Sequence, residues 1–156
     1  MKLFNNISLL LISISTAILL TACGTGHDHG PTPVGLNLLM SGDVIATQQG
    51  TTISYTGDTN YIAVTEGETS PPITVQFFLE SGETYNYSTD DGYSLIVNIG
   101  NSDAVGYNHP VQGSQWDVEL IGVSEGTSTL SFELFHVDHS DFESRNFEVR
   151  VAAASD

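Results

Sequence analysis

The sequence has little of two residue classes that many small extracellular or nucleic-acid-binding proteins depend on. It contains one cysteine, and only three lysines and arginines, among 156 residues. A single cysteine cannot form an intramolecular disulfide, so the fold must be held by its hydrophobic core. The sequence has 19 acidic residues, and together with the three basic ones they give a formal net charge of −16. Nucleic acid is therefore not an expected partner; cations, basic partners or solubility alone remain as explanations for the charge.

Sequence motifs for catalysis are also missing. There is no Gly-x-Ser-x-Gly turn, glycine-rich phosphate loop, His-Glu-x-x-His helix or twelve-residue calcium loop. A carboxylate pair assembled in space is the one catalytic arrangement that 19 acidic residues leave open. We therefore predict a non-enzymatic protein.

The N-terminal segment has the three-part layout of an export signal. Lys2 is its only charged side chain, an apolar run follows over residues 7–20, and the small residue Ala22 comes at the end. About 14 residues are too few to cross a hydrocarbon core of about 30 Å as a permanent helix. We predict that residues 1–22 are cleaved.

The run Leu20-Thr21-Ala22-Cys23 resembles the lipobox of bacterial lipoproteins, with a branched apolar residue three positions before the cysteine and a small residue directly before it. The resemblance implies that the Cys23 thiol carries the lipid, with acyl chains such as palmitate, and anchors the protein to a membrane. Gly24 stands where an aspartate usually retains such lipoproteins in the inner membrane, which favours the outer membrane. The alternative is a secretory signal that contains a cysteine by chance.

The remainder is expected to divide into a tether and one domain. Residues 23–33 have many helix and strand breakers and no apolar side chain to bury, which predicts a flexible, histidine-containing tether. Residues 34–156 carry short alternating runs rich in β-branched and aromatic residues, without a stretch at helical spacing. The expected strands are residues 34–40, 44–47, 51–55, 61–65, 73–79, 93–99, 116–123, 129–137 and 147–152, with a hairpin turn at Ser41-Gly42-Asp43.

Short strands of this number can bury their apolar faces against one another in an all-β sandwich of two sheets. The alternation also predicts which side chains point into its core. These are Trp116, Val118, Leu120, Leu130, Phe132, Leu134, His136, Phe147, Val149 and Val151.

Residues 121–132, with their small Gly- and Thr-containing loop, and the closing Val-x-Val strand at residues 147–151 resemble the end of bacterial immunoglobulin-like domains. The resemblance implies an immunoglobulin-like antiparallel β-sandwich. This motif indicates a fold and not an activity.

Four of the five histidines fall into two clusters, His27-Asp28-His29 in the tether and His136-Val137-Asp138-His139 near the end of the chain. Imidazole is a preferred ligand of zinc, copper and nickel, and nearby carboxylates complete or orient such sites. His136 and His139 require a turn at residues 137–138 to converge, because positions three apart on a straight strand face opposite sides. The candidate metal residues are His27, His29, His136, Asp138, His139 and Asp141. His109 is expected to be an isolated loop residue.

The His-x-His-Gly tether, the Val34-Gly35-Leu36 run and the final His-x-x-His-x-Asp-Phe are together similar to small His-bearing lipoproteins that accompany bacterial metal-uptake systems. The resemblance implies binding of a divalent transition metal, zinc first, and a metal-uptake receptor or transporter as partner.

Other interpretations remain open from the sequence. His27 and His29 also fit a polar linker, and His136 also fits a partly buried strand residue that is hydrogen-bonded to a neighbour. The protein would then be an immunoglobulin-like adhesion or protein-interaction module with incidental histidines. Calcium is the alternative cation, through Asp58 and Asp90-Asp91-Gly92 in predicted loops. As a separate alternative, Tyr85 and Tyr87 mark a carbohydrate or protein surface.

Overall fold

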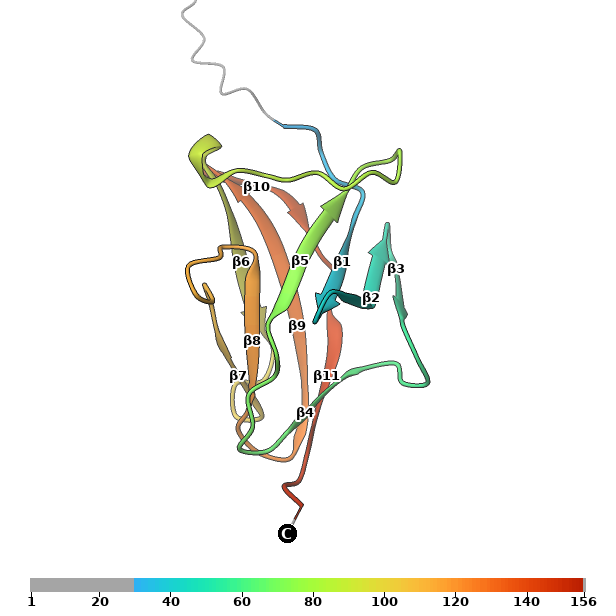
Figure 1. Cartoon of the computed structure of the whole chain (residues 1–156), viewed down its shortest axis with the longest axis vertical. Coiled ribbons are helices and arrows are strands. Elements are labelled where there is room, and N and C mark those ends of the chain that lie inside the picture. Colours follow the sequence, from blue (N-terminus) through green and yellow to red (C-terminus); the bar gives the residue numbers. More distant parts are fainter. Residues whose placement is uncertain (1–29, 156) are drawn as a thin grey trace, which may run out of the picture.

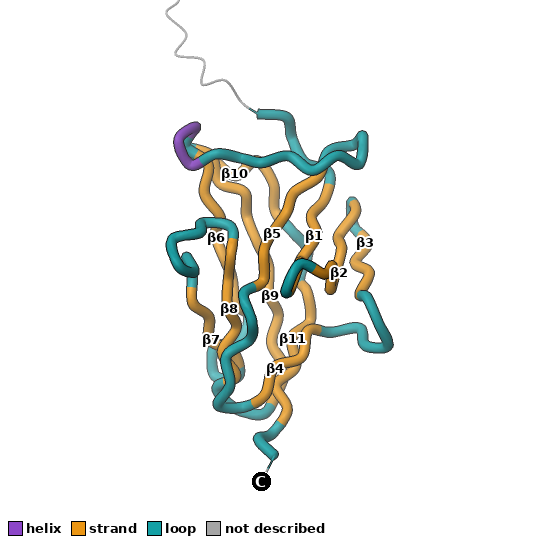
Figure 2. The backbone as a smooth tube through the Cα atoms, in the orientation of Figure 1, coloured by secondary structure: helices purple, strands orange, loops and turns teal. Residues whose placement is uncertain are grey.

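A computed structural model describes residues 30–155, which form two packed layers of strands (Figures 1 and 2). The predicted signal peptide, Cys23, His27 and His29 lie outside the described residues. The elements are β1 Gly35–Met40, β2 Asp43–Gln49, β3 Thr52–Tyr55, β4 Ile62–Thr65, β5 Ile73–Phe78, η1 Thr89–Asp91, β6 Tyr93–Ile99, β7 Val105–Asn108, β8 Asp117–Gly122, β9 Gly126–His136, β10 His139–Glu143 and β11 Phe147–Ala152. The short 3-10 turn η1 is the one helical element within this part of the chain, and no helix there is long and apolar enough to span a membrane.

The strands are arranged as two facing sheets. Sheet 1 has the order β3-β2-β1-β5-β8-β7, and sheet 2 the order β10-β9-β11-β4, with β6 paired to β9. All pairs between these strands are antiparallel except β4 with β11. The immunoglobulin-like β-sandwich predicted from the sequence is confirmed, with this one parallel pair added.

The core lies between the sheets and follows the predicted alternation. In β9 and β11, every second side chain is fully buried, including Leu130, Phe132 and Phe147 at 0% exposure. Trp116, which directly precedes β8, differs from the expectation. It is only partly buried and packs edge-on against Phe77, with ring centroids 6.3 Å apart.

The predicted hairpin turn between β1 and β2 is confirmed. Ser41 and Gly42 have φ angles of 55° and 88°, the left-handed pair that joins tightly twisted antiparallel strands. Two strands were not predicted. β7 is four residues long and contains a glycine, whereas β10 reads His-Ser-Asp-Phe-Glu and has no apolar alternation. β10 matters most, since it folds the chain back directly after His136.

The described chain enters the domain at the end that carries η1 and the β9–β10 turn (Figure 1). The Gly30 N–H donates to the Tyr93 hydroxyl at 2.7 Å, and the Tyr87 hydroxyl donates to the Pro31 carbonyl. Gly30 and Pro31 were expected to belong to the flexible tether of residues 23–33, but these bonds fix them to tyrosines at this end of the sandwich.

Candidate metal site

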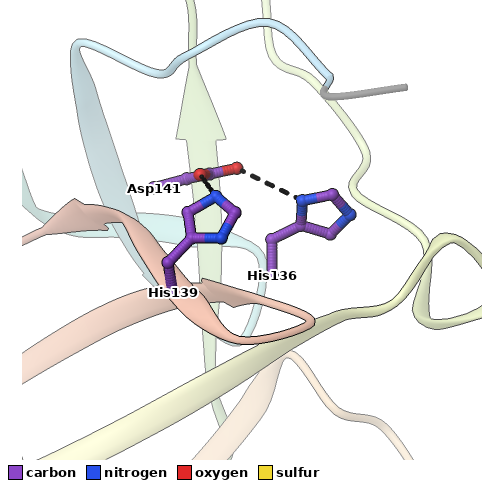
Figure 3. Close-up of side chains that lie close together, drawn as sticks. All are labelled: His136, His139 and Asp141. Carbon is purple, nitrogen blue, oxygen red and sulfur yellow. Dashed lines mark ion pairs between the residues drawn. The ribbon is translucent and has the colours of Figure 1, made fainter. Parts of the chain in front are cut away.

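His136 and His139 meet across a two-residue turn. They are direct register partners at the end of the β9–β10 hairpin, and residues 137–138 form the connection. Their ring centroids lie 5.7 Å apart (Figure 3). The turn that the sequence required for the two imidazoles to converge is therefore present.

Asp141 joins them because β10 is irregular. The register shifts between Ser140 and Phe142, so Asp141 is the extra residue of a β-bulge, and bulges redirect side chains. One carboxylate oxygen lies 2.8 Å from His139 Nε2, and the other lies 3.9 Å from His136 Nδ1 (Figure 3).

Ligand-type atoms of these three residues lie within 4.8 Å of one another, the one such group of three or more His, Cys, Asp or Glu within residues 30–155.

The outer nitrogen of His136 is held by a backbone carbonyl. His136 Nε2 lies 3.0 Å from the Asp91 oxygen, and because a carbonyl only accepts, Nε2 carries the hydrogen. His136 Nδ1 faces Asp141, 3.9 Å from a carboxylate oxygen. The ring is 1% exposed and stacks on Tyr93 with centroids 4.1 Å apart and planes 12° from parallel. His136 is therefore fixed in orientation.

The outer nitrogen of His139 is held by a carboxylate. Nδ1 lies 2.9 Å from an Asp138 oxygen, while Nε2 faces Asp141. The hydrogen bond to Asp138, supported by the charge of Asp141, raises the pKa of His139 above its ordinary value of 6.5. Asp138, one of the predicted ligands, thus lies on the far side of the imidazole, where it orients the ring. Carboxylate–imidazole pairs of this kind are typical of zinc sites.

Tyr93 lies close to Asp141. Burial raises the pKa of the Tyr93 phenol, and the nearby negative charge of Asp141 raises it further. The same hydroxyl accepts the Gly30 N–H. Tyr93 therefore lies beside the cluster and is hydrogen-bonded to the first described residue of the chain. Tyr93 is the register partner of His136 and was not among the candidate residues, because the pairing of β6 with β9 is not visible in the sequence.

The turn that carries the cluster has an unusual backbone. Val137 has a φ of 54°, a conformation that a β-branched residue rarely adopts, and the Asp138 N–H donates back to the His136 carbonyl at 2.6 Å. The Val137 N–H donates to the Gly92 carbonyl at 3.1 Å. η1 and the hairpin are thereby fastened to each other beside His136.

Two imidazole nitrogens and one carboxylate oxygen form a partial tetrahedral ligand set. Zinc holds such atoms at about 2.0–2.2 Å, which places ligand atoms about 3.3 Å from each other. Asp141 oxygens lie 2.8 Å from His139 Nε2 and 3.9 Å from His136 Nδ1, on either side of that separation. At least one coordination position is left for a further ligand.

The residues proposed for calcium are not brought together. Asp58 lies in the loop after β3, on the opposite side of the domain from Asp90 and Asp91 in η1 (Figure 1). None of the three belongs to the close group of ligand-type side chains. Within η1, the Asp91 carbonyl instead orients His136.

Two further expectations change with the structure. Tyr87 is 4% exposed and packs between Tyr85 and Tyr93, so only Tyr85 of the predicted surface pair is open to solvent. His109 does lie in a loop, but it is not isolated. Its nitrogens contact the carbonyls of Asp117 and Leu95 at 2.9 and 3.0 Å, and so bridge the two sheets.

No protein-family model matches the chain, and no curated protein matches it. Three solved structures of the S-layer protein SbsC are similar to part of it. Domains 5–6 align with 17% identity and a TM-score of 0.45, covering 64% of this chain and 43% of that one. For domains 4 and 5 the values are 17%, 0.41, 62% and 49%, and for domains 1–6 they are 16%, 0.45, 80% and 17%. The chain spans less than half the length of each of these structures, and the likeness says nothing about function.

Proposed function

We propose that this domain binds a divalent transition metal, zinc foremost, through His136, His139 and Asp141. The observation that supports this is the partner on the outer nitrogen of each imidazole: a carbonyl on His136 and a carboxylate on His139. Such partners fix the ligands in the orientation that a metal requires, and zinc sites depend on them. A mixed nitrogen and oxygen set suits zinc, copper or nickel, whereas calcium prefers oxygen ligands alone.

One of the tether histidines, His27 or His29, completes the coordination in this proposal. The support is proximity along the chain: Gly30, next to His29, donates its N–H to the hydroxyl of Tyr93, whose ring stacks on His136. A fourth protein ligand closes a zinc site to water, which is characteristic of structural or storage sites and not of catalytic ones. We therefore propose a non-enzymatic metal-binding protein.

The cellular setting of the proposal comes from the sequence. The Leu20-Thr21-Ala22-Cys23 motif supports a lipoprotein anchored through Cys23, and Gly24 favours the outer membrane, on its periplasmic or outer face. The resemblance to His-bearing lipoproteins supports a metal-uptake receptor or transporter as partner. Cys23→Ser should abolish incorporation of a labelled fatty acid and release the protein from membranes after a high-salt wash. Retained labelling together with membrane association would refute the anchor.

Metal binding is tested by zinc-dependent melting of the purified protein. An ion that binds only the folded state stabilises it by about 2.7 kcal/mol at a hundredfold excess over Kd, which raises the melting temperature on the order of 10 °C. Zinc should produce this shift at pH 7.5, and the double variant His136→Ala, His139→Ala should lose it. His27→Ala with His29→Ala should weaken binding with a smaller effect on melting.

Glu143→Gln is the matched control, because it removes a charge from the same strand outside the cluster. Its zinc-dependent shift should equal that of the unaltered protein. Calcium should produce no such shift. An unchanged melting curve with zinc would leave an immunoglobulin-like adhesion or protein-interaction module as the better account.

A further inference from the structure

A recess lies in sheet 1, where β5 passes from one hydrogen-bonding partner to another. The first residues of β5, Ile73 and Thr74, pair with β8, and the Val75 N–H donates to the Trp116 carbonyl at 2.8 Å. Near its other end, β5 is hydrogen-bonded to the segment that precedes η1, with the Tyr85 N–H donating to the Phe77 carbonyl at 3.0 Å. A pocket of about 260 Å³ opens beside these two pairings.

This pocket, the β5 notch, combines aromatic side chains with uncharged polar ones. Its walls include Gln76, Tyr85, Asn86, Trp116 and Asp117. Tyr85 is 38% exposed and Trp116 is only partly buried, and both line the pocket. The two amides each carry donors and acceptors, and Asp117 accepts.

We propose that the β5 notch binds one neutral sugar ring of a glycan. A pyranose has an apolar C–H face that packs on an aromatic ring, and hydroxyls that donate and accept at its edge. The amides of Gln76 and Asn86 match such hydroxyls, and the Asp117 carboxylate can accept from two of them. The notch is smaller than the pockets of about 300–1,000 Å³ that take drug-sized ligands, which fits a single ring with the rest of the glycan outside.

Charge argues for a neutral ligand. The described side chains that line the notch include one carboxylate and no lysine, arginine or histidine. The protein as a whole carries a net charge of −16. An anionic sugar would meet repulsion without a compensating cation. A quaternary ammonium group is the competing ligand, because aromatic rings beside a carboxylate also attract such cations.

The sequence supplies a local reporter, since Trp116 is the only tryptophan. The full-length protein should be purified in a polyoxyethylene detergent, because sugar-based detergents would compete for the notch. Glucose, galactose, mannose, N-acetylglucosamine and their disaccharides are then titrated while Trp116 emission is recorded. Saturation-transfer NMR on the same sugars detects binding that leaves the emission unchanged. A saturable response to at least one sugar is expected.

Variants separate the notch from unspecific contact. Tyr85→Ala and Asn86→Ala should each raise the apparent Kd about tenfold or more. Tyr107→Ala is the control, since Tyr107 is similarly exposed at 43% but lies on β7 outside the notch.

The proposal is overturned if no sugar gives either signal, or if Tyr85→Ala binds as tightly as the unaltered protein. It is likewise overturned if tetramethylammonium gives the emission response and Asp117→Asn abolishes it. The notch shares no residue with the metal cluster, so chelation of zinc should leave sugar binding unchanged.

Discussion

Tyr93 and His136 are stacked register partners across β6 and β9, with ring centroids 4.1 Å apart. The phenol ring covers one face of the imidazole, and its hydroxyl accepts the Gly30 N–H and lies near Asp141. One side chain thus supports His136 and holds the start of the described chain. The candidate metal site is therefore built on the sandwich and does not depend on the hairpin alone.

Tyr93→Phe separates these two roles. The variant keeps the stacked ring and removes the hydroxyl, so the fold should remain while Gly30 loses its acceptor and Asp141 loses a neighbouring polar group. Loss of an outer hydrogen bond typically weakens a metal site by about 10–100-fold. Calorimetric titration with zinc at pH 7.5 should show a drop in affinity of that order with little change in the apo melting temperature. An unchanged zinc affinity would mean that the hydroxyl does not orient Asp141.

The pH dependence of zinc binding should report His139. Asp138 raises the pKa of His139, so the proton that zinc must displace is held at a higher pH than the ordinary 6.5. Zinc affinity should therefore begin to fall above pH 6.5 as the pH is lowered. For the apo protein the sign is opposite: protonated His139 stabilises the fold fully below pH 6.5, and this contribution is lost as pH rises through the raised pKa.

Asp138→Asn should move the midpoint of zinc binding to lower pH, because it removes the largest cause of the raised pKa. Titrations between pH 5 and 8 provide the measurement, with Glu143→Gln as the charge-matched control. Coincident pH profiles for Asp138→Asn and the unaltered protein would contradict the role assigned to Asp138.

Val137→Gly should be tolerated better than an ordinary valine-to-glycine change. The φ of 54° strains a β-branched residue but not glycine. Val123→Gly is a matched control, because both side chains are about half exposed, at 49% and 50%, and Val123 is not among the positive-φ residues. The control should lose about 0.5–1 kcal/mol of unfolding free energy in denaturant titration. Equal losses in the two variants would show that Val137 carries no strain.

Phe132 and Trp116, both expected in the core, differ in burial. Phe132 is fully buried, so Phe132→Ala should cost about 3–5 kcal/mol. Trp116 is only partly buried and packs at the edge of the core, so Trp116→Ala should cost clearly less. Denaturant unfolding followed by far-UV circular dichroism compares the two. If Trp116→Ala lost more unfolding free energy than Phe132→Ala, the assignment of Phe132 to the centre of the core would be wrong.

Features that depend on neighbouring residues in the sequence could be predicted. The alternation of apolar residues over 129–137 and 147–152 is such a feature, so it identified the core side chains of these strands and placed His136 on the inner face. The need for a turn at residues 137–138 also followed from strand geometry alone. The bulge at Asp141 did not, because it depends on how β10 pairs with β9 and β10 has no apolar pattern.

The hydrogen bond that holds the His136 ring could not be predicted from the sequence either. The Asp91 carbonyl lies 45 positions away along the chain and reaches the imidazole only because η1 and the hairpin meet at one end of the sandwich. The spacing of Asp90 and Asp91 indicated a cation loop, whereas the backbone there orients a histidine. Contacts between distant loops leave no periodic signal in either segment.

The central claim is that His136, His139 and Asp141 hold one metal ion together. The most direct measurement is an anomalous difference map, collected at the zinc absorption edge from crystals of the domain grown with zinc at pH 7.5. We expect one strong peak at about 2.0–2.2 Å from His136 Nδ1, His139 Nε2 and an Asp141 oxygen. The same peak should vanish in crystals of the His136→Ala, His139→Ala variant. A map with zinc bound elsewhere on the acidic surface, and no peak between these three side chains, would contradict the account.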